Sequence, residues 1–356
     1  MELNARQLCL IAGGLFPLTK LILLPSSLAY YAGKDLFLPA LILLLLEGGV
    51  LFSVLQLSSK TDKTFFELLS DTFGRLTARI VFGVYGAYFL FSALLPVYEQ
   101  TLLLRTAFYD TIPSPLFFAA FYIVCIYLCL KPFKSFGRCA DFLVPVSSVA
   151  LLLLLALSVS DAKFSSLLPL FQTSAKTIAL TAARSVPRFL DCAFPLFFLG
   201  HFRHEKNTTL KVMLSFLAGA LFLLLFLCTF YAVYGVIAPA RSSAISKIGR
   251  YFPGVDVIGR IDLLLIYLLS GSYLLYLMLP FRLSVHCLKT CFQTKDEYDV
   301  FYAVGINLIA FVLYFFLNYT VVHFEQFVSG FYLLPIFVLF SYFIPVLART
   351  LRRSHA

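Results

Sequence analysis

Long apolar stretches recur along the whole chain, separated by short polar segments, and no other feature restricts its fold as strongly. Hydrophobic residues make up 61% of the 356 residues and charged residues only 13%, against roughly 45 to 50% and 25% in soluble domains. A helix needs about 20 apolar residues to cross a hydrocarbon core about 30 Å thick, and many stretches here are that long. We therefore predict a polytopic, all-α membrane protein.

Hydropathy predicts ten transmembrane helices, which divide into five and five. The first five spans are expected near residues 8–31, 36–57, 80–104, 115–130 and 142–159, and the second five near 178–200, 212–238, 257–288, 300–319 and 331–348. We expect one membrane domain over residues 1–356, made of a first repeat at 1–160, a second at 161–349 and a basic cytoplasmic tail at 350–356.

Lys and Arg residues predict the orientation of the chain. With the N-terminus in the cytoplasm, the inner segments hold 17 Lys and Arg residues and the outer segments hold 7. This excess follows the positive-inside rule and predicts that both termini are cytoplasmic. The basic residues are scattered over short loops, so the net charge of +10 does not indicate nucleic-acid binding. Segment 1–7 is too short and too polar for a cleavable signal peptide, so we expect the first span to be retained.

The first and sixth spans are interrupted in the same way. An odd number of spans in each half predicts an inverted repeat, and in such transporters the first helix of each repeat is broken near mid-membrane. Residues 13–25 read GGLFPLTKLILLP and residues 181–195 read TAARSVPRFLDCAFP, each with two prolines and with charge. Proline frees a backbone carbonyl, which in lipid needs an ion or a ligand ammonium as partner. We therefore predict ligand binding at Gly13, Gly14, Phe16 and Thr19.

Several stretches resemble the spore germination permease family, the B subunits of GerA-type germinant receptors. They are YAGKDLFLP at 31–39, KTFFELLSDTFGRLTARIVFGVY at 63–85, FGRCADFLVP at 136–145, SSLLPLF at 165–171 and YFPGVDVIGRIDLLLIY at 251–267. The resemblance implies a LeuT-like fold of the amino acid, polyamine and organocation transporter type. It also implies a location in the spore inner membrane, or otherwise the cell membrane.

The same resemblance implies that the chain senses an amino acid or similar small nutrient together with two partner subunits. One partner is a larger membrane subunit and the other a lipoprotein. The alternative is a secondary transporter that moves an amino acid with protons, because one fold serves both functions.

Lys20 lies near the middle of the first predicted span, where insertion scales put the cost of a charge at about 2.5 to 3.5 kcal/mol. Its side chain is therefore expected to face the protein interior. In one interpretation its ammonium occupies a cation site near Ser270 and Ser272, which makes function sodium-independent and proton-sensitive. In the other it forms a static ion pair with Glu47 or Glu99.

Arg184, Arg188 and Asp191 are spaced to share one face of a continuous helix. A guanidinium at a broken helix can hold a carboxylate with two hydrogen bonds, which suits an amino-acid ligand. The alternative is that this segment forms the wall of a water-facing vestibule.

Glu47 and Glu99 are isolated carboxylates within spans, for which a functional role is the first interpretation. A neutral acid hydrogen-bonded to nearby backbone is the alternative. Tyr98, next to Glu99, is expected either to line the central cavity or to contribute to packing. Asp256 and Arg260 are expected to cap the start of the eighth span.

No catalytic signature such as GxSxG, HExxH or a Walker phosphate loop is present, so neither an enzyme nor a cofactor is predicted. His201 and His204 flank Arg203, which would repel a cation, and we expect them in a solvated loop. Two pairs of cysteines four positions apart lack further metal ligands, and we interpret them as buried small apolar residues: Cys125 with Cys129, and Cys287 with Cys291.

Overall fold

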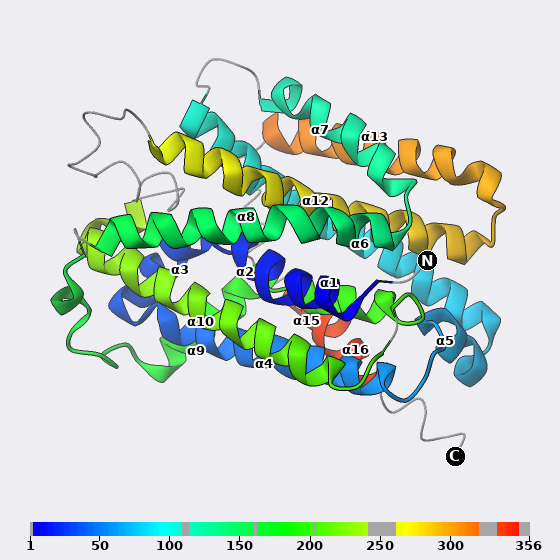
Figure 1. Cartoon of the computed structure of the whole chain (residues 1–356), viewed down its shortest axis with the longest axis horizontal. Coiled ribbons are helices and arrows are strands. Elements are labelled where there is room, and N and C mark those ends of the chain that lie inside the picture. Colours follow the sequence, from blue (N-terminus) through cyan, green and yellow to red (C-terminus); the bar gives the residue numbers. More distant parts are fainter. Residues whose placement is uncertain are drawn as a thin grey trace.

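The computed structural model describes residues 3–108, 114–159, 162–202, 204–240, 261–319 and 333–348. Within these ranges the chain is helical apart from short connections and one isolated β-bridge between Leu3 and Phe202. Most of the helices run roughly along the long axis of the molecule and form a bundle (Figure 1).

The longest helices form the body of the bundle. They are α4 (Phe37–Ser58), α6 (Arg75–Phe108), α7 (Ser114–Cys129), α8 (Phe133–Val159), α10 (Thr208–Tyr234), α12 (Ile261–Phe292) and α13 (Asp299–Tyr319). Shorter helices are α5 (Phe65–Phe73), α9 (Ala175–Ser185), α15 (Leu334–Val338), the π-helix η10 (Leu339–Phe343) and α16 (Ile344–Ala348). Short 3-10 helices are η2 (Gly33–Asp35), η3 (Phe164–Leu167), η6 (Gly235–Ala240) and η8 (Asp296–Tyr298).

The chain is a multi-pass helical membrane protein. Six helices among the described residues are long and apolar enough to cross a membrane, or seven if a bent pair at the N-terminus counts as one span. Each of the ten predicted ranges overlaps a helical segment. However, α7 and the segment 334–348 are too short to count as membrane-crossing helices, and residues 178–200 form several short helical pieces. The residues predicted to cap the eighth span, 256 and 260, lie outside the described residues.

The first span is broken as the sequence predicts. It begins with α1 (Ala5–Leu10), continues through the π-helix η1 (Ile11–Leu15) and α2 (Phe16–Thr19), and resumes as α3 (Leu24–Ala32) after a bend of 58°. Pro17 lies in the first turn of α2 and Pro25 in the first turn of α3, where a missing backbone N–H is tolerated. The break therefore begins at Lys20, between these two prolines.

The first span also packs unusually close to α10. A Cβ atom added to Gly219 would lie 2.0 Å from the carbonyl oxygen of Gly13, and one added to Gly13 would lie 2.4 Å from the carbonyl oxygen of Ser215. Only glycine permits such contact between two backbones, as at small-residue interfaces between membrane helices. The two helices are thereby held together just before the break.

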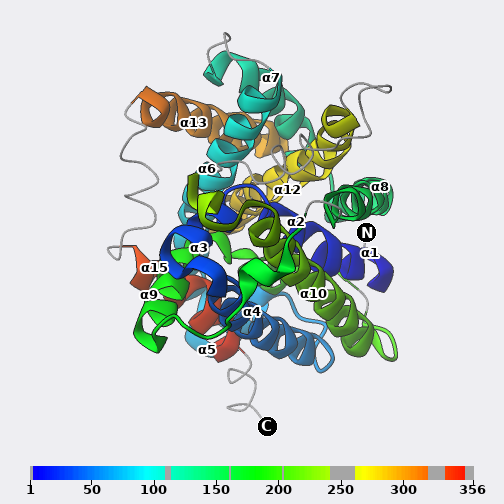
Figure 2. The same ribbon diagram turned by 90° about the vertical axis from the view of Figure 1, so that its left-hand side faces the viewer.

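Figure 2 shows α2 and α3 near the middle of the bundle and α1 toward one edge beside α8, with α6 and α12 above them, α4 and α10 below, and α7 and α13 at the top. Aromatic rings fill the space between α5, α6 and the sixth predicted span, as in the contact of Tyr85 with Phe197 at 4.8 Å between ring centres. The sixth predicted span therefore packs against the core at its interrupted part.

A buried carboxylate joins the two halves of the chain after α3. Asp35 is fully buried and accepts hydrogen bonds from the backbone N–H groups of Phe171 and Thr173, each at 2.8 Å. Asp35 belongs to the YAGKDLFLP stretch and Phe171 ends the SSLLPLF stretch. These two stretches, far apart in sequence, are thus in direct contact.

Candidate functional site

The breaks in the first and sixth predicted spans meet in the interior of the bundle. Helix α9 ends at Ser185 and is followed by the 3-10 turns η4 (Val186–Arg188) and η5 (Asp191–Phe198). Pro187 in η4 cannot donate the hydrogen bond that a continuing α-helix requires. Two irregular segments therefore lie together where charged side chains are enclosed.

Lys20 forms ion pairs with two carboxylates in this interior. Its Nζ lies 2.5 Å from Oδ2 of Asp191 and 3.2 Å from Oε1 of Glu47 on α4. The exposed fractions of the Lys20 and Glu47 side chains are 1%. The predicted ion-pair geometry with Glu47 is therefore present, and Asp191 is a second partner that the sequence interpretation did not include.

The chain's own donors satisfy the carbonyls at the break. Thr19 Oγ1 donates to the carbonyl oxygen of Phe16 at 2.8 Å, and Lys20 Nζ donates to the same oxygen at 3.3 Å. Tyr273 of α12 donates to the carbonyl of Leu18. Side chains of the protein thus fill the place in which we expected an ion or a ligand ammonium.

Further contacts stabilise the charges of this cluster. Tyr276 of α12 donates a hydrogen bond to Oδ1 of Asp191. The ring of Phe189 lies below the Lys20 ammonium, with 4.8 Å between Nζ and the ring centre, which is a cation–π distance. Glu47 Oε2 has no hydrogen-bond partner among the described residues. If all three groups are ionised, the cluster carries one negative charge, so one added proton makes it neutral.

A second buried ion pair lies beside the first. Arg188 Nε of η4 donates to Oε1 of Glu99 on α6 at 2.8 Å, and both side chains are almost completely buried. Removal of one partner from such a buried pair leaves the other charge uncompensated, which destabilises a protein by roughly 3 to 5 kcal/mol. The two side chains are therefore expected to stay paired.

A small cavity of about 20 Å³ lies beside the pair of Arg188 and Glu99. Its polar lining consists of Thr19, Ser92, Glu99, Arg188 and Tyr276, which come from the first span, α6, η4 and α12. This space holds about one water molecule and is too small for an amino acid. The site is therefore polar, central and closed in this structure.

The structure brings together most of the charged residues that the sequence identifies. Lys20, Glu47 and Asp191 form one cluster, Arg188 and Glu99 form the other, and Thr19 lines the small cavity beside the second cluster. Phe16 contributes its carbonyl and packs against Phe194 of η5 with 5.9 Å between ring centres.

Other predicted residues lie elsewhere. Gly13 and Gly14 line a separate apolar cavity. Tyr98 is partly buried and packs against the apolar core. Ser270 Oγ donates to the carbonyl of Ile266, and Ser272 Oγ accepts from Ser147 of α8 at 2.7 Å. The structure thus pairs both serines with other partners and places the carboxylates, not the serines, at Lys20.

The expected common face of Arg184, Arg188 and Asp191 is wrong. The spacing argument requires a continuous α-helix, but α9 ends at Ser185 and the backbone changes direction before η5. The guanidinium of Arg184 lies 4.5 Å from the centre of the Tyr31 ring, while the other two residues contact Glu99 and Lys20. Because the helix is interrupted around Pro187, residues on either side of the break do not follow the spacing of a continuous helix.

Tyr273 and Tyr276 are the residues of the site that sequence reasoning missed. They are three positions apart on α12 and share one face, from which Tyr273 reaches the first span and Tyr276 reaches Asp191 of η5. That spacing is the signal that identifies them, but twenty tyrosines in the chain make it weak.

The histidines are less exposed than expected. His204 is partly buried and its Nδ1 lies 3.1 Å from Oγ of Ser58, while the ring of His201 stacks near that of Phe133 at 5.3 Å. Burial, and secondly the charge of Arg282, lower the pKa of His201 below its ordinary value. The segment is irregular, as expected, but it folds back onto α4 and α8, so both rings are partly covered and not fully solvated. The described residues contain no group of three metal-ligating side chains.

Comparison with known proteins supports the family assignment. No curated protein matches the chain significantly. A family model described as spore germination protein matches residues 19–320, which include the first break, both ion pairs and the two tyrosines of α12. The match covers most of the chain, and the chain therefore belongs to the spore germination protein family of permease-like membrane proteins.

Proposed function

We propose that the chain is the permease-like subunit of a spore germinant receptor and that it binds an amino acid or a similar small nutrient near mid-membrane. The observation that carries this proposal is the buried pair of Arg188 and Glu99 at the edge of a polar cavity. Intramembrane charges of this kind mark ligand or ion sites.

An amino acid carries one carboxylate and one ammonium. The carboxylate is complementary to the guanidinium of Arg188, and the ammonium is complementary to the carboxylate of Glu99. In our proposal the ligand enters between them, so that its carboxylate binds the guanidinium and its ammonium binds Glu99. The exchange keeps the site neutral and leaves no buried charge alone, which keeps the electrostatic cost low. A planar guanidinium also suits a carboxylate better than a lysine does.

Entry of a ligand requires the site to open, because the present cavity of about 20 Å³ holds only about one water molecule. Separation of Arg188 from Glu99 moves η4 relative to α6. We propose that this movement between the interrupted segments and α6 is the signal that reaches two partner subunits, a larger membrane protein and a lipoprotein.

The proposal also covers the arrangement of the helices and the membrane in which the chain lies. Ten helical segments as a LeuT-like inverted repeat would place both breaks near the centre of the membrane, as the interrupted first and sixth segments suggest. We propose the spore inner membrane as its location, with both termini in the cytoplasm.

A proton-coupled amino-acid transporter is the second candidate. It is favoured by the cluster of Lys20, Asp191 and Glu47, which one proton makes neutral, and by the unpartnered oxygen of Glu47 among the described residues. In this alternative Glu47 is the group that gains and loses the proton.

One comparison tests the receptor and separates it from the transporter. Spores of a deletion strain are exposed to a panel of amino acids, and uptake of the same amino acids is measured in vesicles with and without a pH gradient. The receptor proposal expects that the deletion spores no longer germinate with at least one amino acid. It also expects that the vesicles show no uptake driven by the pH gradient. Normal germination with every amino acid would contradict it, and uptake that depends on the gradient would support the transporter.

A further inference from the structure

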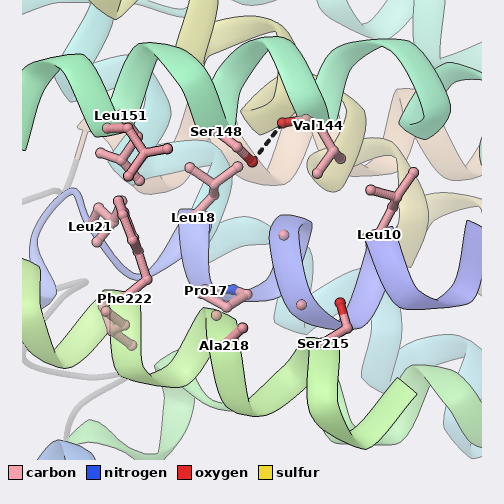
Figure 3. A pocket seen from close by; sticks show the side chains of 15 residues that line it. Leu10, Pro17, Leu18, Leu21, Val144, Ser148, Leu151, Ser215, Ala218 and Phe222 are labelled. Carbon is pink, nitrogen blue, oxygen red and sulfur yellow. Dashed lines mark hydrogen bonds between the residues drawn. The ribbon is translucent and has the colours of Figure 1, made fainter. Parts of the chain in front are cut away.

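A second cavity, of about 250 Å³, lies between the first span, α8 and α10, and it shares no lining residue with the charged site. Figure 3 shows the first span between the two longer helices, with Leu18, Leu151 and Phe222 around the same space. The first span contributes residues from Leu10 to Leu21. This cavity therefore adjoins the break from a different side than the ion pairs.

The cavity is apolar. None of the described residues that line it is charged, and its two hydroxyl groups are already hydrogen-bonded to backbone. Ser148 Oγ donates to the carbonyl of Val144 at 2.8 Å, and Ser215 Oγ donates to the carbonyl of Cys9 at 2.8 Å. Water needs two to four polar partners in such a space, and a charged ligand needs more. The lining offers neither.

The mouth of the cavity opens on the surface of two predicted membrane spans. Leu152 of α8 lines the cavity and is 55% exposed, and Ala218 of α10 is also exposed. Val149 on α8 and Leu217 and Leu221 on α10, which lie one to three positions from these residues, are also exposed. Both helices are long and apolar enough to cross the membrane, so this surface faces hydrocarbon.

Two glycines let the first span pack directly against the other walls of the cavity. A Cβ atom at Gly14 would lie 2.2 Å from Cγ1 of Val144, and one at Gly13 would lie 2.4 Å from the carbonyl oxygen of Ser215. Close contacts therefore bound the cavity on the side of these glycines. The atoms around an empty apolar space of this size lose dispersion contacts, which an apolar occupant restores.

We propose that this cavity binds the terminal part of an acyl chain of a membrane lipid. The lining residues lie in the middle of the first span, which runs from α1 to the end of α3. The ends of acyl chains reach that depth in a hydrocarbon core about 30 Å thick. A water-soluble apolar nutrient is disfavoured as occupant, because the lining has no partner for its charged groups.

The acyl chain contacts the hinge of the broken helix. Leu18 and Leu21 flank Thr19 and Lys20 in sequence and line the lipid cavity, while Thr19 lines the charged site. The lipid therefore packs against the same short segment that carries the buried lysine.

Photolabelling tests this site. The full chain is reconstituted in phosphatidylcholine vesicles that contain a phospholipid with a diazirine near the acyl terminus, and labelled residues are mapped by mass spectrometry. We expect label within residues 10–21. Ser148→Phe fills the cavity and should reduce this label several-fold, whereas Val149→Phe, at the adjacent exposed position outside the cavity, should leave it unchanged.

The proposal is overturned if residues 10–21 stay unlabelled while the exposed leucines of α10 are labelled, or if Ser148→Phe retains the label. Competition by excess free leucine would assign the cavity to a water-soluble ligand and would also overturn it. Size-exclusion chromatography checks that each variant is folded. If Ser148→Phe aggregates, Ala218→Phe fills the space from the opposite wall and must show the same loss.

Discussion

Lys20 and Asp191 are 171 positions apart in the sequence, and their side chains form a buried ion pair with 2.5 Å between Nζ and Oδ2. Lys20 stands at the break of the first span and Asp191 begins η5 after the interruption that follows α9. The pair therefore joins the two irregular segments of the bundle. Any movement of one segment changes the electrostatic environment of the other.

Lys20→Met tests whether this pair is structural. The substitution leaves Asp191 and Glu47 buried without their cation, and breaking a buried pair costs about 3 to 5 kcal/mol. We expect low abundance of the protein in membranes by immunoblot, and recovery when Asp191→Asn and Glu47→Gln are both added. Lys60→Met, at an exposed position, is the control.

The cation-site interpretation predicts a different result for the same variant. If the ammonium takes the place of a bound sodium ion, wild-type function is independent of external sodium, and Lys20→Met is normally abundant but inactive. A sodium requirement in the wild type, or a normal response of Lys20→Met, would contradict that interpretation.

Gly219→Ala tests the backbone contact between α10 and the first span. The added methyl group would lie 2.0 Å from the Gly13 carbonyl oxygen, so one helix must shift. Overpacking of this kind costs about 1 to 3 kcal/mol. We expect a lower melting temperature of the purified protein in detergent. The control is Gly49→Ala on α4. Apart from the nearby backbone of α4 itself, no atom of the described residues lies within 4 Å of a Cβ added there, and no loss is expected.

Asp35→Asn tests the contact between the turn after α3 and the segment at 171–173. The carboxylate accepts two backbone N–H bonds, and hydrogen bonds to a charged group contribute about 1.5 to 3 kcal/mol each. We expect a lower melting temperature and faster proteolysis between α8 and α9. Asp71→Asn, which changes an exposed ion pair with Lys63, should have little effect. Equal stability of the two variants would show that Asp35 is dispensable.

Reporter fusions test the orientation. The distribution of 17 inner and 7 outer Lys and Arg residues predicts that a reporter after residue 356 is cytoplasmic and that one near residue 247 is external. An external C-terminus would exclude the ten-helix arrangement and the inverted repeat.

Local chemistry made the helical pattern and its interruptions predictable. Apolar runs identify helices because lipid requires them, and prolines at 17, 25, 187 and 195 mark the breaks because each lacks a backbone donor. The number of helices that meet the length criterion is smaller than predicted, since hydropathy does not reveal where a span divides into short turns.

The partners of the charged residues were only partly predictable. An intramembrane lysine demands a carboxylate, which pointed to Glu47 or Glu99. The five charged residues of the two clusters allow several pairings, however, and only the folded chain selects among them. The proposed face of Arg184, Arg188 and Asp191 failed because it used helical spacing across a proline break. The apolar cavity was not foreseen, since it results from how the first span, α8 and α10 pack together and not from any motif.

Equilibrium binding of radiolabelled amino acids to membranes that contain the chain tests the central claim most directly, namely that a zwitterion binds between Arg188 and Glu99. We predict that the wild type binds at least one amino acid and that its carboxyl amide fails to compete. Arg188→Lys should weaken binding at least tenfold at normal abundance, because lysine lacks the planar fork. Arg184→Lys, outside the cavity lining, is the matched control and should retain affinity. Equal binding of the amide, or unchanged affinity of Arg188→Lys, would contradict the account.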